Sequence, residues 1–151
     1  MVALDAAGIT YSIHEYERGE DLHGFGREAA EALGLPYEQV FKTLVVVVDD
    51  DELVVAVVPV DCQLSMKRVA AAVGAKKAAM CDPARAERSS GYIVGGISPI
   101  GQRKRLRTVI DETAELFDVV YVSGGKRGMD IGLAPADLIG LLDATVAEIT
   151  A

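Results

Sequence analysis

Two long apolar runs dominate the chain. Residues 41–48 read FKTLVVVV and residues 52–59 read ELVVAVVP, and three consecutive aspartates join them. Two runs of β-branched residues with a short polar connection predict a β-hairpin. Because both strands are apolar at nearly every position, we expect both faces of their sheet to be covered.

Shorter patterns predict further strands. Residues 10–16 (TYSIHEY) alternate, with Tyr11 and Ile13 on one face, which indicates a strand. Residues 108–111 and 119–123 are typical of strands on either side of a short helix at 113–117, and residues 146–149 could close the sheet.

Capping signals predict the helices. Gly34 and Gly74 stand where the residue after a helix adopts a left-handed conformation. Ala29, Ala32 and Leu33 fall on one helical face. The expected helices cover residues 26–33, 65–73, 82–88 and 135–142, with Ser65 and Asp82 as N-caps and with Pro83 and Pro135 in the first turn. Strands and helices mix without strict alternation, so we expect an α+β fold with a mixed sheet.

Length and composition fit one globular domain over residues 1–151. The chain has a mass of 16.0 kDa and is 50% hydrophobic and 25% charged, which excludes disordered, collagen-like and disulfide-framework classes. No apolar run approaches the ~20 residues that cross a bilayer, and the start MVALDAAGIT does not resemble a secretion signal. We therefore expect a cytoplasmic protein without a membrane partner. Cys62 and Cys81 are too few and too far apart for a metal motif.

The charge is unevenly distributed. The formal net charge is −8, but residues 67–107 carry ten basic and two acidic side chains, whereas residues 1–66 and 108–151 are strongly acidic. This basic block could lie along a nucleic acid, or it could be a solvated charged face, and the sequence leaves both readings open.

The common hydrolase and nucleotide-binding motifs are missing. The chain has no H-E-x-x-H and no G-x-S-x-G sequence, and residues 124–128 lack the spacing of a complete P-loop. His14 and His23 fit structural or solvated roles better than that of a catalytic base.

Several polar residues stand at the ends of strong elements. Lys42 and Thr43 interrupt an apolar strand, where an ammonium group is costly to bury unless it meets an anion or reaches water beside the strand. Residues 95–101 (GGISPIG) contain three glycines around Ser98, which suits either an anion-binding nest or a tight turn.

A later segment, residues 123–130 (SGGKRGMD), follows a predicted strand. A flexible loop with Ser123, Lys126, Arg127 and Asp130 could recognise a ligand, or it could be an exposed basic turn.

These segments together resemble a known family. The chain is similar to the YbaK proteins in three segments: FKTL at 41–44, GGISPIG followed by QRKR at 95–105, and YVSGGKRG at 121–128. These are bacterial Cys-tRNA(Pro)/Cys-tRNA deacylases, related to the editing domain inserted in prolyl-tRNA synthetase. The resemblance covers almost the whole chain in order. It implies the fold of the YbaK/aminoacyl-tRNA synthetase-associated domain, a mixed central sheet or partly closed barrel with surrounding helices, and it implies release of cysteine from mischarged proline tRNA.

The resemblance also implies a set of site residues. It places the family's functional tyrosine on Tyr16, its pocket phenylalanine on Phe25, and its essential lysine and neighbouring threonine on Lys42 and Thr43. It places the pocket glycine on Gly95 or Gly96, and the late serine and aspartate on Ser123 and Asp130. Ser98, Lys126 and Arg127 are further candidates for substrate binding. Residues 18–24 do not align with the family pattern, and the start before Gly8 is short. Relatives that remove alanine carry a His-Pro and an Asn in place of SGGKRG, so this chain resembles the cysteine-directed branch.

The implied mechanism is assisted by the substrate. The thiol of the esterified cysteine attacks its own carbonyl, and a cysteine thiolactone forms, without a protein nucleophile, metal or cofactor. Lys42 would hold a phosphate, N–H groups of Gly95 and Gly96 would bind the oxyanion, and the remaining site residues would fix the adenosine and the α-amino group. Two alternatives stay open: a deacylase for alanyl- or seryl-tRNA, and a non-catalytic module that binds aminoacyl-tRNA ends or nucleotides and docks on prolyl-tRNA synthetase.

Overall fold

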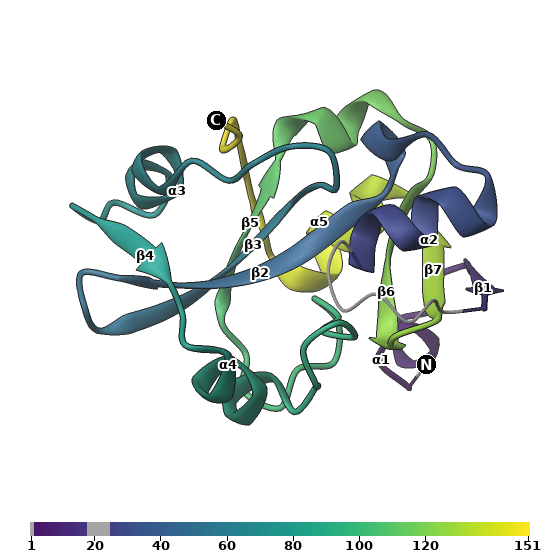
Figure 1. The fold of residues 1–151 in the computed structure, drawn as a ribbon, viewed down its shortest axis with the longest axis horizontal. Helices are drawn as coiled ribbons and strands as arrows, with labels where there is room; N and C mark the ends of the chain where they lie inside the picture. The colour runs from purple at the N-terminus through teal and green to yellow at the C-terminus, as the bar shows by residue number, and fades with distance from the viewer. Residues whose placement is uncertain (1, 18–24) are drawn as a thin grey trace.

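The computed structural model describes residues 2–17 and 25–151 and contains two β-sheets. The larger sheet has the strand order β4 (Ala78–Met80), β2 (Phe41–Val48), β3 (Glu52–Pro59), β5 (Arg107–Asp111) and β8 (Thr145–Ala147). The smaller has the order β1 (Tyr11–Glu15), β7 (Met129–Leu133) and β6 (Val120–Lys126). The β2–β3 and β3–β5 pairs are antiparallel and parallel respectively, which confirms the expected mixed sheet in an α+β fold (Figure 1).

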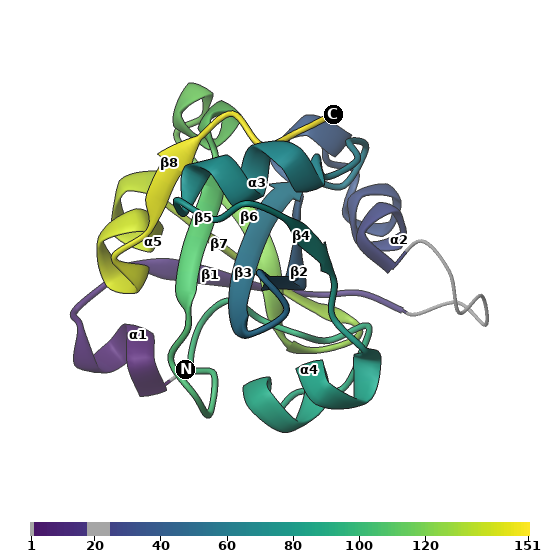
Figure 2. The same cartoon turned by 90° about the vertical axis from the view of Figure 1, so that its left-hand side faces the viewer.

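Helices surround the two sheets (Figure 2). They are α1 (Val2–Ala6), α2 (Phe25–Leu33), α3 (Met66–Ala72), α4 (Pro83–Ser90) and α5 (Pro135–Leu142), with short 3₁₀ helices η1 (Tyr37–Gln39) and η2 (Glu112–Leu116). The predicted caps are confirmed: the Ser65 and Asp82 side chains accept hydrogen bonds from the N–H groups of Arg68 and Ala84 at 3.2 and 3.3 Å.

The β2–β3 hairpin forms with the predicted strand ends, from Phe41 opposite Pro59 to Val48 opposite Glu52. Both of its faces are covered, as expected. Val55 and Val57 pack into a core with α1, α5, β6 and β7, and the alternate residues of β3 pack into a second core beneath α3. This burial on both faces explains why the strand sequence is almost uninterrupted valine.

The segment predicted as a flexible loop at 123–130 is instead a second hairpin. β6 extends to Lys126 and β7 begins at Met129, with a register irregularity between Ser123 and Lys126. The hairpin was not predicted because glycine is rare inside strands, and this segment contains several glycines. The structure gives the reason for one glycine: Gly125 has a φ of 106°, a backbone conformation that residues with a side chain rarely adopt.

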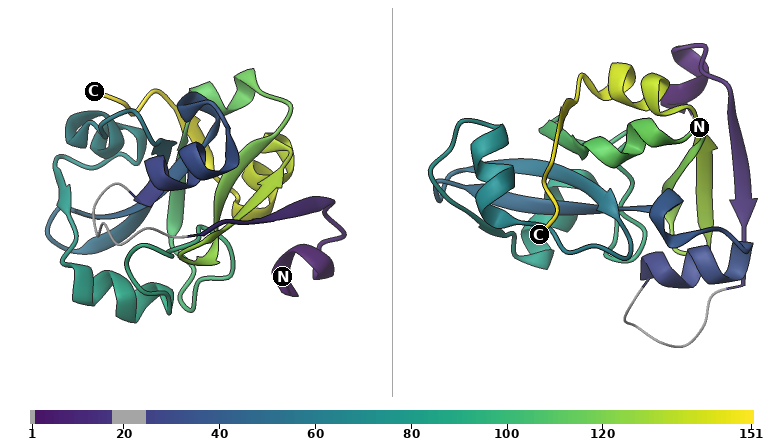
Figure 3. Two further views of the ribbon diagram at one scale, coloured as in Figure 1. Left: turned by 45° about the vertical axis from the view of Figure 1, so that its right-hand side comes forward. Right: turned by 90° about the horizontal axis from the view of Figure 1, so that it is seen from above.

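The two sheets approach each other at the start of β2. An isolated bridge joins Val40 to Tyr121 of β6, and α2 packs its buried Ala29 and Ala30 against Val40 (Figure 3). Among the residues that the structure describes, β2 therefore has no strand partner on one edge between this bridge and β4, which begins its pairing at Val46.

Some local predictions were wrong. The strand predicted at residues 10–16 is confirmed as β1, although Ile13 on this strand is 52% exposed. Ala30 is buried in α2 where Ala32 was expected. Neither α1 nor the three-residue β4 was predicted from the sequence. Within the described residues, no helix is both long and apolar enough to span a membrane.

Candidate functional site

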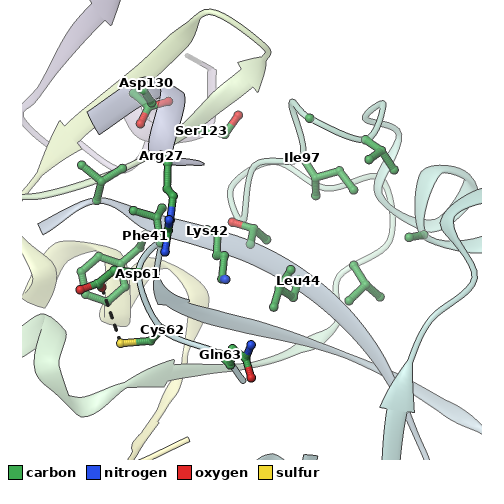
Figure 4. A pocket seen from close by; sticks show the side chains of 18 of the residues that line it. Arg27, Phe41, Lys42, Leu44, Asp61, Cys62, Gln63, Ile97, Ser123 and Asp130 are labelled. Atoms are coloured by element: carbon green, nitrogen blue, oxygen red, sulfur yellow. Dashed lines mark hydrogen bonds between the residues drawn. The ribbon is translucent and has the colours of Figure 1, made fainter. Parts of the chain in front are cut away.

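The open edge of β2 forms the floor of a pocket of about 600 Å³. Residues 40–45 contribute to its lining, together with the turn after β3, the start of α4, the loop before Ser98 and the β6–β7 hairpin. Six of the residues predicted from the sequence meet here: Tyr16, Lys42, Thr43, Gly95, Ser123 and Asp130. Figure 4 shows Lys42 between Cys62 and Gln63 on one side and Ser123 and Asp130 on the other.

Lys42 is half-buried in this pocket. Burial lowers the pKa of its ammonium group, and the nearby Arg27 guanidinium lowers the pKa further, while Cys62 and Asp61 oppose the shift. An anion between two cations in a partly desolvated pocket gains more than it would in water. This end of the pocket therefore has the character of an anion site.

Thr43 lies beside Lys42 on the same strand. Its hydroxyl oxygen is buried and has no hydrogen-bond partner among the described residues. A buried polar atom without a partner usually costs stability. Thr43 also contributes to the lining of the pocket.

Asp130 is the buried acid of the site, only 5% exposed. Burial raises the pKa of its carboxyl group from 3.8 to about 6. No lysine or arginine of the described residues forms an ion pair with it. The neighbouring Tyr16 is held by a hydrogen bond from its N–H to the Gly128 carbonyl at 3.0 Å, and burial and Asp130 together raise the pKa of its hydroxyl. An unpaired buried carboxylate is suited to receive a cationic ligand group.

The two glycines at 95 and 96 have different roles. Gly95 lines the pocket with a φ of 95°, and its N–H has no hydrogen-bond partner among the described residues. Gly96 is buried outside the lining, and its N–H donates to the Ile93 carbonyl at 2.9 Å. A Cβ on Gly96 would lie 2.7 Å from the backbone of Lys126 and Arg127. The predicted oxyanion role is therefore open to Gly95, whereas Gly96 permits close packing against the hairpin.

Three further candidates lie away from this pocket. Ser98 is 2% exposed, and its hydroxyl accepts a hydrogen bond from the Ile100 N–H at 3.1 Å. Lys126 is exposed near the hairpin turn. Arg127 forms an ion pair with Glu28 of α2 at 2.7 Å, with both side chains 16% exposed. Phe25 is the first residue of α2, and its side chain lies outside the described residues, as does His23.

Sequence reasoning missed several pocket residues. Arg27 comes from α2, and Asp61, Cys62 and Gln63 come from the turn after β3. Only the three-dimensional fold places them beside Lys42, so no local signal could have found them. The other end of the pocket is apolar and is lined by Leu44, Val45, Met80, Cys81, Pro83, Ala86, Val94 and Ile97.

The side chains that could act as nucleophiles are not activated. The Cys62 thiol donates to Asp61 at 3.6 Å, and burial together with Asp61 raises its pKa. Burial also raises the pKa of the Cys81 thiol. The Ser123 hydroxyl accepts from the Gly125 N–H at 3.3 Å, and no described histidine lines the pocket. Within the part of the chain that the structure describes, no cluster of three or more His, Cys, Asp or Glu could hold a metal ion.

Comparisons with known proteins agree on one family. The model of the "Aminoacyl-tRNA editing domain" family matches residues 20–141. A protein of Enterococcus faecalis named "Putative Cys-tRNA(Pro)/Cys-tRNA(Cys) deacylase EbsC" is 41% identical over 150 residues, which cover 99% of this chain and 91% of the relative.

Two solved structures share the fold. "Crystal structure of hypothetical protein APE2540" has a TM-score of 0.87 at 24% identity and covers 98% of this chain and 96% of that chain. A structure described as "a putative trans-editing enzyme for prolyl tRNA synthetase" has a TM-score of 0.86 at 24% identity and covers 99% and 93%. The matched family model covers residues 20–141, which include every described residue of the pocket lining except Tyr16. The chain therefore belongs to the aminoacyl-tRNA editing domain family.

Proposed function

We propose that this protein is a trans-editing deacylase that releases cysteine from mischarged Cys-tRNA(Pro). The observation that carries the proposal is the pocket at the β2 edge, where Lys42, Thr43, Ser123 and Asp130 meet in a member of the editing family. The name of the 41% identical relative supplies the substrate. Prolyl-tRNA synthetase is the source of this mischarged tRNA and the partner that we propose.

The charges of the pocket suit the end of an aminoacyl-tRNA. Lys42, with Arg27 nearby, receives the phosphate next to the terminal adenosine. Asp130 receives the α-ammonium group of the esterified amino acid, because it is a buried carboxylate without a cationic partner in the described structure. The hydroxyl groups of Thr43 and Ser123 form hydrogen bonds with the ribose and the ester. An anion site and a carboxylate on opposite sides of one pocket hold the ester between them.

The chemistry then needs no protein nucleophile. The substrate's own sulfur attacks the ester carbonyl carbon, the bond from that carbon to the ribose oxygen breaks, and the ribose oxygen takes up the thiol proton. The products are tRNA and cysteine thiolactone. A well-oriented intramolecular attack has an effective molarity of ~10⁵ M or more, equivalent to about 7 kcal/mol of the barrier.

The developing oxyanion needs a donor in the pocket. We assign this role to the Gly95 N–H, because Gly95 lines the pocket and its N–H has no hydrogen-bond partner among the described residues, whereas the Gly96 N–H is already bonded. A single donor of this kind contributes about 3 kcal/mol to the transition state.

A multiple-turnover assay with Cys-tRNA(Pro) tests the proposal. Release of cysteine should exceed the rate in buffer and fall to that rate in Lys42→Ala. Lys76→Ala removes an equally charged but exposed lysine outside the pocket and should retain full activity. If the wild-type protein binds the aminoacyl-tRNA but never releases cysteine at micromolar concentration, the protein is a binding module and the proposed activity is wrong.

A further inference from the structure

The fold places the cations of the basic block at residues 67–107 in different surroundings. Some are neutralised by ion pairs: Arg68 with Glu148, Lys77 with Asp50, and Arg107 with Glu52, each at 2.7 Å. Within the described part of the chain, Arg85, Arg88, Lys104 and Arg105 have no such ion pair and, together with Arg107, line a separate groove beside α4 of about 710 Å³. We call it the α4 groove, and its lining consists of Asp51, Glu52, Leu53, Arg85, Arg88, Ser89, Lys104, Arg105, Leu106 and Arg107.

The α4 groove has a fixed shape. The N–H groups of Arg103 and Lys104 donate to the carbonyls of Ser90 and Ser89 at 2.8 and 3.1 Å, which holds the chain beside the end of α4. Arg85 donates to the Asp51 carbonyl at 3.1 Å. These contacts hold two separate cationic segments side by side.

The charge of the groove is not compensated. Five cations and two carboxylates line it, and the Glu52 carboxylate is already bound by Arg107. Arg85, Arg88 and Lys104 are exposed and have no ion-pair partner among the described residues. The Ser89 hydroxyl is buried and also has no hydrogen-bond partner there. A concentrated positive groove on a chain with net charge −8 attracts an anionic partner to that face.

One helix separates the groove from the pocket. Pro83 and Ala86 of α4 line the pocket, whereas Arg85 and Arg88 of the same helix line the α4 groove. The helix lies below the β2–β3 hairpin in Figure 1. Its width with side chains is about 10–12 Å. A polyanion whose end occupies the pocket can therefore pass over α4 and reach the groove.

We propose that the α4 groove binds the sugar–phosphate backbone of the RNA that carries the ester in the pocket. This inference rests on the proposed function and adds a second contact site for the same substrate. Contacts from arginine and lysine to phosphates position a nucleic acid without reading its sequence. The groove thus increases affinity for RNA in general, and the pocket selects the esterified end.

The test compares two substrates and two variants. The groove variant is Arg85→Gln/Arg88→Gln/Lys104→Gln. The control Lys67→Gln/Arg68→Gln/Lys77→Gln removes the same charge from the opposite side of the basic block. Both variants and the wild type are assayed for kcat/KM with Cys-tRNA(Pro) and with the cysteinyl ester of adenosine, and their binding of uncharged tRNA is measured by fluorescence anisotropy as the salt concentration rises.

The groove variant should lose about tenfold or more in kcat/KM for the tRNA and keep the wild-type value for the adenosine ester. Its tRNA affinity should depend less on salt, with the slope of log Kd against log salt reduced by about 2 to 3. The control should retain both values.

Several outcomes would overturn the inference. Equal loss with both substrates would indicate damage to the pocket, and unchanged tRNA binding and cleavage would leave the groove without a role in RNA binding. The kcat/KM measurement with Cys-tRNA(Pro) is repeated with prolyl-tRNA synthetase added, and a loss that appears only in this arm would assign the groove to an acidic protein surface. Because binding of uncharged tRNA is measured separately, failure of the proposed deacylase activity would be distinguishable from failure of the groove.

Discussion

Replacement of Asp130 by asparagine should stabilise the protein at neutral pH while removing its activity. The carboxyl group is 5% exposed, and burial raises its pKa from 3.8 to about 6. At pH 7.5 the folded protein therefore holds a buried charge that the unfolded chain would solvate freely. One pKa unit corresponds to 1.36 kcal/mol, so the cost of this charge is about 3 kcal/mol.

The sign of the pH dependence follows from linkage. The folded-state pKa is higher than the unfolded-state value, so the folded protein binds more protons between pH 3.8 and about 6. The stability contributed by this group is fully present below pH 3.8 and is lost as the pH rises through about 6. Asp130→Asn cannot ionise and should avoid that loss.

Urea denaturation measures this effect directly. At pH 7.5 the variant should gain up to about 3 kcal/mol in free energy of unfolding, an upper limit because the asparagine amide also needs partners. At pH 4 the two proteins should differ little. The variant should also lose cysteine release, because it no longer attracts the α-ammonium group. A variant that is less stable than the wild type by the same amount at both pH values would refute this reasoning.

Other substitutions test individual parts of the site. In wild-type protein, kcat/KM should fall as the pH drops through about 6, because Asp130 becomes neutral, and a profile flat to pH 5 would contradict its role. Cys62→Ser/Cys81→Ser should keep the wild-type rate of release, since neither thiol is activated, and a rate measured at zero would make one of them the nucleophile. Gly96→Ala should lower the free energy of unfolding, measured in urea, by about 1–3 kcal/mol, because its Cβ would lie 2.7 Å from backbone atoms of the hairpin. An unchanged free energy of unfolding would show that the hairpin can move away from this Cβ at no cost.

Local signals explain how much of the fold could be predicted from the sequence. The β2–β3 hairpin and the caps at Ser65 and Asp82 depend on residues close together in the chain, and they were predicted correctly. The β6–β7 hairpin was not, because its glycines suit a loop as well as a strand. The reason for these glycines is visible only in the folded hairpin, where Gly125 and Gly128 have φ values of 106° and 95°.

The candidate site was predictable where a resemblance to the family identified its motifs. Lys42, Ser123 and Asp130 come from separate strands and meet in one pocket. Arg127 has the residue type expected of an RNA contact, but its ion pair with Glu28 connects the hairpin to α2. Neither Arg27 nor Asp61 could be assigned to the site beforehand, because their positions beside Lys42 depend on how α2 and the turn after β3 pack against β2.

The central claim is that the esterified cysteine supplies the attacking sulfur. The most direct measurement is the single-turnover rate of Ala-tRNA(Pro) and Cys-tRNA(Pro) with the same enzyme preparation. Cysteine should be released rapidly as its thiolactone, and alanine should be released no faster than in buffer. Equal rates for the two esters, or a cysteinyl group found covalently attached to the protein during turnover, would contradict it.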